Sequence, residues 1–383
     1  MSTRHALAPR HAAATLPDAG WHAILRPVDD GSQSSFADML DRYALPGLLL
    51  LAAAVYAPLV GADFVWDDQM LVLDLQERRG SGFLQLFTSD LWAAESGSGP
   101  HASAYYRPLT SLHFALLSRV FGTSAPAFHA ASVGLHLLCG ALLFGLLRRI
   151  VDGLQGSGSA LLPALGAGLF LFHPLQQEAV AFVSACNDLY AGIACVLGLH
   201  LWLRDRVVAA AVCLFVGLLF KETAVVLLLA LPVYDQVRGR RPRVVSLVTA
   251  VTLYAVLRFG VAGVGGEGLP PLGPAGVIEW SGYWVSALLL PVDVGPYRPL
   301  SPLAGQVWPW VAVIVAAGAV VWGAIRLPRI LPGALIAVTA LTLTLPVSID
   351  HGYAGDRYAY VALVGLAVAL VAQLLGLGLG QVP

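Results

Sequence analysis

Two adjacent carboxylates, Asp67 and Asp68, follow directly after the first long apolar run, in the sequence Phe64-Val65-Trp66-Asp67-Asp68. Spanning a membrane does not require acids at this place. A carboxylate held within hydrogen-bond reach of a hydroxyl can act as its general base. The second acid could orient that base, or the pair could hold a divalent cation. The alternative reading is a solvated loop pair or a helix cap just outside the bilayer.

Three cations stand where polar residues interrupt apolar sequence, and they are candidates for binding a phosphate group: Arg107, Lys221 and Arg357. Arginine suits this task because its planar fork can make two parallel hydrogen bonds to phosphate. Lys221 is the only lysine in the chain. The alternatives are a lipid headgroup contact for Arg107 and a simple ion pair or hairpin turn at Lys221-Glu222.

Five further polar residues are candidates for lining the same site on its acceptor side: Tyr106, His173, Glu178, Asp188 and Glu222. Several have ordinary explanations. Tyr106 fits a belt of interfacial aromatic residues, and Glu178 heads a helix whose dipole favours an acid. Asp188 lies two to three turns inside that helix, where an unpaired acid is costly.

Composition identifies the broad class. Of 383 residues, 57% are hydrophobic and only 12% are charged, whereas soluble domains average about 25% charged. We therefore expect an all-α polytopic membrane protein. A net charge of −1 without a basic stripe argues against a nucleic-acid partner. The four cysteines are scattered through apolar runs, so we expect neither a disulfide framework nor a zinc site.

Apolar runs near the length of a membrane span predict a bundle of about 10–11 transmembrane helices. They cover approximately residues 45–62, 128–147, 160–172, 179–203, 207–220, 223–233, 244–264, 307–325, 330–346 and 358–377. The short run Trp284–Pro291 is expected to be re-entrant or interfacial. In the long polar segment after the first span, residues 83–87 and 109–120 are weakly amphipathic and suit helices lying along the membrane surface.

Arginines set the expected orientation, because short cytoplasmic loops are enriched in positive charge. Arg148-Arg149, Arg204 with Arg206, and the cluster Arg238–Arg243 fall after alternate spans. This pattern places both termini in the cytoplasm and all the candidate polar residues at the outer face. Because each would be costly if left bare in lipid, we expect them to share one polar cavity.

The expected domain organisation has three parts. Residues 1–43 are expected to form a partly disordered cytoplasmic N-terminal tail, without a cleavable signal peptide and with a short interfacial helix ending at Tyr43. Residues 44–379 form the transmembrane domain, with 63–126 as its first extracytoplasmic loop, and 380–383 are a short C-terminal end.

The ordered series of short motifs resembles a known family. The series runs Phe64-Val65-Trp66-Asp67-Asp68, Tyr106-Arg107-Pro108-Leu109, His136, His173-Pro174 with Glu178-Ala179-Val180, Asp188-Leu189, Lys221-Glu222 and Asp356-Arg357-Tyr358-Ala359-Tyr360. It is similar to the membrane portion of the transmembrane and tetratricopeptide-repeat O-mannosyltransferases and their bacterial relatives, within the C-type membrane glycosyltransferase (GT-C) superfamily. The resemblance covers roughly residues 60–365.

The resemblance implies a GT-C-like fold and a glycosyltransferase of a bacterial inner membrane, with its active site facing the periplasm. The enzyme would move a hexose, such as mannose, from a polyprenyl-phosphate-linked donor to a hydroxyl of a protein or glycan acceptor, inverting the anomeric carbon. The resemblance also implies that Asp67 or Asp68 is the catalytic base, and that Arg107, Lys221 and Arg357 stabilise the leaving phosphate. No cofactor is implied with certainty, and a divalent cation, if one is used, would lie at Asp67 and Asp68.

The sequence departs from the family pattern in three places. The family's second loop usually reads His-Pro-x-His-Thr-Glu, whereas Gln176-Gln177 precede Glu178 here, and Asp356 replaces a glutamate near the last span. The chain ends at Pro383, soon after its last expected span, so we also expect it to lack the repeats.

Two other classes of function fit the same residues. A lipid-linked-sugar transporter or flippase also needs acids and arginines in a polar cavity, and an inactive relative could serve as a membrane scaffold. Internal repeats related by pseudo-symmetry would favour a transporter, and the sequence shows none.

Overall fold

The computed structural model describes residues 31–73, 83–92, 103–155, 159–265, 273–289 and 328–376, together with scattered positions between 291 and 325. In this part of the chain the prediction of an all-α polytopic membrane protein is confirmed, because five helices are long and apolar enough to span a bilayer. They cover Asp38–Gly61, Ala125–Leu154, Val183–Trp202, Pro328–Ser348 and Asp356–Gly376, and three shorter apolar helices cover Leu161–Phe172, Val207–Phe220 and Val245–Val261.

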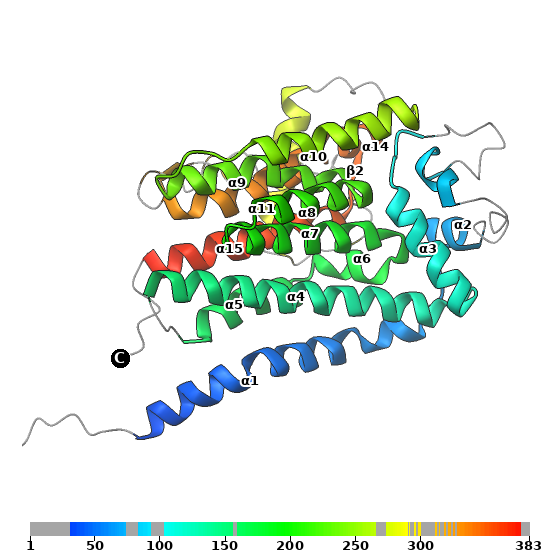
Figure 1. The fold of residues 1–383 in the computed structure, drawn as a ribbon. Coiled ribbons are helices and arrows are strands. Elements are labelled where there is room, and N and C mark those ends of the chain that lie inside the picture. The colour runs from blue at the N-terminus through cyan, green and yellow to red at the C-terminus, as the bar shows by residue number, and fades with distance from the viewer. Residues whose placement is uncertain are drawn as a thin grey trace, which may run out of the picture.

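The helices run along one common direction, with the short elements of the first polar segment gathered at one end (Figure 1). The first half of the described chain contains α1 (Gly31–Tyr56), η1 (Ala57–Gly61), α2 (Asp67–Leu73), η3 (Phe83–Phe87), α3 (Pro108–Phe121), α4 (Ala125–Gln155), α5 (Leu161–Phe172), α6 (Gln176–Ala181), η4 (Val183–Ala185) and α7 (Cys186–Trp202). The second half contains α8 (Val207–Phe220), η5 (Glu222–Val225), α9 (Val226–Val237), α10 (Val245–Ala255), η6 (Val256–Val261), α11 (Pro274–Leu289), β1 (Arg298–Pro299), η8 (Pro328–Ile330), α13 (Leu331–Thr342), α14 (Leu345–His351), β2 (Tyr353–Ala354), η9 (Asp356–Ala359) and α15 (Tyr360–Gly376).

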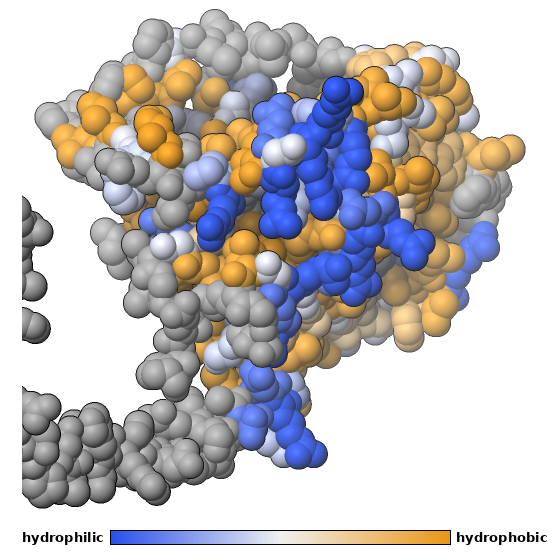
Figure 2. Space-filling view, turned by 60° about the vertical axis from the view of Figure 1, so that its left-hand side comes forward, coloured by the Kyte–Doolittle hydropathy of each residue, from blue (hydrophilic) through white to orange (hydrophobic). Residues whose placement is uncertain are grey.

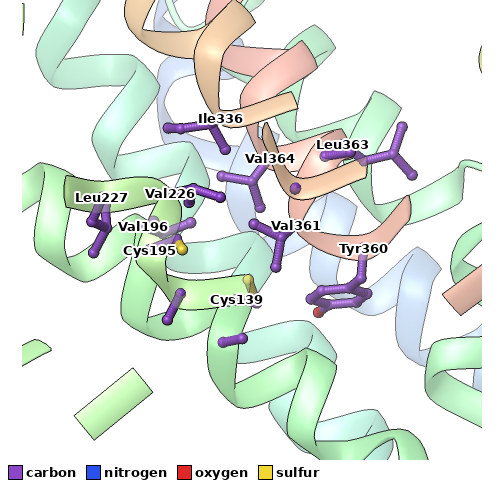
Figure 3. Packing of buried hydrophobic residues seen from close by; sticks show 14 of the residues in the cluster. Cys139, Cys195, Val196, Val226, Leu227, Ile336, Tyr360, Val361, Leu363 and Val364 are labelled. Carbon is purple, nitrogen blue, oxygen red and sulfur yellow. The ribbon is translucent and has the colours of Figure 1, made fainter. Parts of the chain in front are cut away.

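The core lies where α4, α7, α9, α13 and α15 meet (Figure 3). Cys139 of α4, Cys195 of α7, Leu227 of α9, Ile336 of α13 and Val364 of α15 are fully buried there. These helices are apolar around most of their circumference, as expected for helices that contact other helices on several sides. All four cysteines of the chain are free thiols.

Helices α13 and α15 pack unusually closely because a glycine stands on each at the crossing. A Cβ atom added to Gly333 would lie 2.6 Å from the Gly365 carbonyl oxygen, and one added to Gly365 would lie 2.5 Å from the Gly333 carbonyl oxygen. Small residues let helix backbones approach in this way within membranes. The close contact fixes α15 and, with it, the η9 segment that precedes it.

The expected fourth span, residues 179–203, is interrupted. Helix α6 ends at Ala181, Phe182 adopts an extended conformation, and the chain resumes in η4 and α7. Breaking a helix frees backbone N–H groups that need acceptors. Here the distant carboxylate of Asp68 accepts hydrogen bonds from the backbone N–H groups of Val183 and Ser184, so a residue of the first polar segment caps this break.

Other elements refine the expected boundaries. Helix α1 is continuous from Gly31, so the expected boundary between tail and first span at residue 43 falls inside it. Residues 83–87 and 109–120 are helical, in η3 and α3. The run Trp284–Pro291 falls largely in α11, which is not one of the candidate spans. The expected span at 307–325 lies almost entirely outside the described residues.

Candidate active site

A cavity of about 510 Å³ opens at the end of the bundle where α2, η5, η9 and α14 meet. Its described lining includes five of the ten residues singled out from the sequence. These are Asp67, Arg107, Lys221, Glu222 and Arg357. They come from segments up to 290 residues apart in the chain, so the fold alone brings them together. The expectation of one shared polar cavity holds for these five, whereas Asp68, Tyr106, His173, Glu178 and Asp188 lie outside its described lining.

The two adjacent acids have different surroundings. Asp67 is half-buried and lines the cavity. Asp68 is fully buried and is not among the described lining residues. Its carboxylate accepts hydrogen bonds from the Ser184 backbone N–H and hydroxyl, both at 2.6 Å, and from the N–H groups of Val183 and Val65 at 3.3 and 3.4 Å. Asp68 therefore holds the first polar segment against η4, while Asp67 forms part of the cavity wall.

Electrostatics suit Asp67 to accept a proton. Burial raises the pKa of the Asp67 carboxyl above that of an ordinary aspartate, and the positive charge of Arg357 acts in the opposite direction. A carboxylate with a raised pKa is a stronger base. Trp66, directly before it, adopts a positive φ of 46°, a backbone region that non-glycine residues rarely occupy. The Trp66 ring packs edge-on against Phe182 at 5.9 Å, which anchors this strained step.

Arg357 is oriented by Glu178. The buried Glu178 carboxylate accepts hydrogen bonds from the backbone N–H of Arg357 at 2.8 Å and from its guanidinium Nη1. Burial raises the pKa of Glu178, and the charge of Arg357 partly offsets that effect. The short helix α6 packs against η9, so this pair joins two loops. Glu178 is outside the described lining, and it acts through Arg357 rather than facing the cavity.

Lys221 has a similar buried partner. Its Nζ lies 2.5 and 2.6 Å from the two carboxylate oxygens of Asp188, and both side chains are buried. Burial lowers the pKa of Lys221, and the charge of Asp188 opposes that effect. Lys221 Nζ lies 5.4 Å from the ring centroid of Tyr358, and the Arg357 guanidinium lies 5.0 Å from the same ring. Lys221 and Arg357 thus contact one aromatic ring in the cavity wall.

Glu222 bridges two arginines on the other side of the cavity. Its carboxylate oxygens lie 3.1 Å from Arg107 and 3.4 Å from Arg258. Burial acts to raise the pKa of Glu222, but the charges of Arg107 and Arg258 outweigh it and the pKa is lowered. Arg258 also donates to the Ala104 carbonyl at 2.7 Å. The Nε atoms of Arg107 and Arg258 are buried without a hydrogen-bond partner among the described residues.

His173 and Tyr106 lie outside the described lining and have structural contacts. The His173 ring bonds to the Leu288 carbonyl at 3.3 Å and accepts from the Leu175 N–H, so it fixes the turn after α5 against α11. The Tyr106 hydroxyl donates to the Phe87 carbonyl at 3.1 Å. His136, part of the motif series, is buried between the Tyr360 hydroxyl and the Leu171 carbonyl.

The lining also contains polar residues that were not among the sequence candidates. Arg258 is one of them, and it adds a fourth cation to the cavity. A lone arginine within an apolar run is the sequence feature that could have identified it as a candidate. Asn187 and Thr223 also line the cavity, and the Asn187 Oδ1 and Thr223 Oγ1 atoms are buried without a partner in the described part of the chain. Such unpaired polar atoms are uncommon in proteins, and a polar ligand in the cavity could satisfy them.

Charged side chains of both signs meet at the cavity, which is lined by the acids Asp67, Glu222 and Asp350 as well as by cations. Four cations line it, namely Arg107, Lys221, Arg258 and Arg357. All four are paired with acids: Arg107 and Arg258 with Glu222, Lys221 with Asp188 and Arg357 with Glu178. Their positions are therefore fixed before a ligand arrives. No group of three His, Cys, Asp or Glu side chains among the described residues is arranged to hold a metal ion. A divalent cation at Asp67 stays a prediction.

Fold and site together define an all-α polytopic membrane protein with a cationic cavity at one end of its bundle. The chain is 32% identical over 206 residues to the Protein O-mannosyl-transferase Tmtc2 of Drosophila melanogaster. The match covers 49% of this chain and 21% of that protein. It is 31% identical over 209 residues to Tmtc1 of the same species, covering 52% of this chain and 23% of that protein. The mouse protein O-mannosyl-transferase TMTC2 is 29% identical over 200 residues, and the match covers 48% of this chain and 23% of that protein.

These matches extend over only about a fifth to a quarter of the relatives' own length. No protein-family model matches the chain. No solved structure matches it either.

Proposed function

We propose that this protein is a membrane glycosyltransferase of the O-mannosyltransferase type. It transfers a hexose from a polyprenyl-phosphate-linked donor to a hydroxyl of a protein or glycan acceptor on the extracytoplasmic face. The observation that carries the proposal is the cavity whose lining brings the half-buried Asp67 together with four cations that acids hold in place. The relatives named as protein O-mannosyl-transferases support the reaction class.

In the proposed reaction Asp67 is the base. Its carboxylate accepts the proton of the acceptor hydroxyl as the hydroxyl oxygen forms a bond to the anomeric carbon. The bond from that carbon to the phosphate oxygen breaks, and its electron pair leaves on the polyprenyl phosphate. Attack from the side opposite the phosphate inverts the anomeric carbon.

The leaving phosphate needs positive charge more than it needs a proton. Arg357 and Lys221, which share contact with the Tyr358 ring, would bind it, with Arg107 completing the set. Cations that are already positioned stabilise charge as it develops in the transition state without reorganising. Glu178 and Asp188 are positioning residues in this account, since each holds a cation rather than touching the substrate.

Proteoliposomes containing a polyprenyl-phosphate hexose and a hydroxyl-bearing peptide separate this proposal from a flippase. A transferase consumes the donor and releases one polyprenyl phosphate for each glycosylated peptide. A flippase moves the donor between leaflets and leaves it intact, which would overturn the proposal. We expect Arg357→Gln to lower transfer by about 10²–10³-fold. The control Arg241→Gln, an exposed arginine outside the cavity, should leave transfer unchanged.

A further inference from the structure

The other end of the bundle carries a second cavity that the proposed reaction does not use. Its volume is about 610 Å³. Five arginines line it, and they come from four separate parts of the chain: Arg148 and Arg149 from α4, Arg204 from the turn after α7, Arg238 from the end of α9 and Arg329 from η8. Figure 2 brings this end forward and shows hydrophilic side chains gathered into a patch there.

The charge of this cavity is largely uncompensated. Arg148 is paired with Asp41 at 3.0 Å and with Asp152 at 3.2 Å. Arg149, Arg204, Arg238 and Arg329 make no salt bridge with any acid that the structure describes. Asp152 is the sole acid among the described lining residues. Enrichment of arginine at a cytoplasmic face is expected from the rule for loop charges, but that rule does not require four unpaired guanidinium groups to converge on one hollow.

The neighbouring arginines provide a contrast within the same end. Arg240 and Arg243 lie 2.9 Å from Asp205, and Arg243 also lies 2.7 Å from the buried Asp235. These two arginines hold the turn after α9 and do not belong to the described cavity lining. Arg240 and Arg243 are thus held by acids, whereas four of the five cavity arginines have no acidic partner among the described residues and are available to a ligand.

The walls of the cavity match a lipid more than a soluble anion. Below the arginines the lining is apolar, and it comes from helices that span the membrane: Leu146, Ile150, Leu199, Leu203, Pro332, Val368 and Ala372. Arg148 and Arg149 lie in the last two turns of the span Ala125–Leu154, Arg204 lies just after the span Val183–Trp202, and Arg329 lies at the start of the span Pro328–Ser348. Phospholipid headgroups lie at the ends of such spans. The His200 Nδ1 atom, also in the lining, is buried without a partner among the described residues.

We propose that this cavity binds the phosphate headgroup of an anionic phospholipid. The arginines would contact the phosphate, and the apolar wall would contact the upper part of the acyl chains. Basic pockets between membrane helices bind anionic headgroups in this way. The site is separate from the candidate active site at the opposite end, and it stands whether or not the protein transfers a sugar.

Native mass spectrometry of the full chain in detergent, titrated with phosphatidylglycerol, tests this proposal. The variant Arg204→Gln/Arg238→Gln removes two cavity charges. Its matched control, Arg206→Gln/Arg241→Gln, removes two exposed charges from the same end outside the described lining. We expect the first variant to bind the lipid roughly thirtyfold more weakly and the control to be nearly unchanged, at about 1 kcal/mol per arginine and 1.4 kcal/mol per factor of ten. Equal weakening in both would mean general surface attraction and would overturn the proposal.

A charge-neutral pair of variants guards against misfolding as the explanation. A Cβ added to Gly145, in the cavity lining, meets open space, as does one added to Gly134 eleven residues earlier on the same helix. Gly145→Leu should block lipid binding, while Gly134→Leu should not, with equal thermal unfolding midpoints. Binding that survives Gly145→Leu contradicts the assigned site.

Two further titrations identify the ligand. Phosphatidylcholine carries the same phosphate without net negative charge and should bind at least tenfold more weakly than phosphatidylglycerol. Inorganic phosphate at the same concentration should not displace phosphatidylglycerol. If inorganic phosphate displaces the lipid, or if phosphatidylcholine binds equally, the anionic lipid is not the ligand.

Discussion

Asp67 and Asp68 are neighbours in α2, where successive side chains point about 100° apart, and their surroundings differ. The Asp68 carboxylate points toward η4 and accepts four hydrogen bonds, three from Val183 and Ser184 and one from the backbone N–H of Val65. Asp67 instead lines the cavity. The two carboxylates should therefore respond differently to the same conservative substitution.

Asp68→Asn should weaken folding. An asparagine retains one acceptor oxygen, but its own N–H groups would oppose the N–H groups of Val183 and Ser184, at about 1–3 kcal/mol for each donor left unsatisfied. Thermal unfolding in detergent should show a lowered midpoint for Asp68→Asn and an unchanged one for Asp67→Asn. Equal midpoints for the two variants would argue against the capping role of Asp68.

The pH dependence of transfer reports on Asp67. As a base it works only when deprotonated, and burial raises its pKa while Arg357 lowers it. Activity should therefore be lost on acidification at a pH above about 3.9, the value for an ordinary aspartate. In Arg357→Gln the residual activity should be lost at a still higher pH, and Arg357→Lys should restore much of the difference. If the low-pH side of the pH–rate profile stays in the same place in these variants, Arg357 does not influence the protonation of Asp67.

Sequence alone identified many of the cavity residues because arginine, lysine and paired acids are conspicuous among apolar runs. It could not assign their roles. Whether Glu178 and Asp188 face a ligand or hold Arg357 and Lys221 depends on contacts between segments up to 179 residues apart. Arg258 escaped selection because it stands inside a run that was taken as a membrane span.

At the scale of elements, the break between α6 and α7 positions the site. It turns Phe182, Ser184 and Asn187 toward the cavity, where all three form part of the lining. The sequence predicts one continuous span over residues 179–203 because most residues there are apolar. The break depends on Asp68, 115 residues earlier, and long-range capping of this kind leaves no local signal.

The close crossing of α13 and α15 should be sensitive to a single methyl group. Gly365→Ala would place a Cβ against backbone atoms of α13 at 2.5 Å, and overpacking of this kind costs about 1–3 kcal/mol. Its unfolding midpoint in detergent should fall. Gly134→Ala, where the added Cβ meets open space, is the matched control and should be neutral or slightly stabilising. A neutral Gly365→Ala would mean that the two helices can separate without loss.

At the scale of the whole molecule, the chain presents two unlike ends. One gathers Asp67 and the four cations of the candidate active site, and the other gathers the arginines of the second cavity. The arginine pattern in the sequence anticipated this division, because loop charge alternates with each crossing. Which end faces the cytoplasm stays a prediction.

Labelling with a membrane-impermeant maleimide tests that orientation. Gln69 and Gln236 are exposed at opposite ends, while three of the four native cysteines are buried. In intact cells Gln69→Cys should react and Gln236→Cys should react only after the membrane is opened. The opposite labelling pattern would invert the topology and place the candidate active site in the cytoplasm.

The central claim is that Asp67 is the base of a sugar transfer. The most direct test is the single-turnover rate of hexose transfer from a polyprenyl-phosphate donor by purified, folded Asp67→Asn. We expect a rate about 10²–10⁴-fold below that of the unaltered protein, with donor binding retained. Transfer at an undiminished rate by folded Asp67→Asn would contradict it.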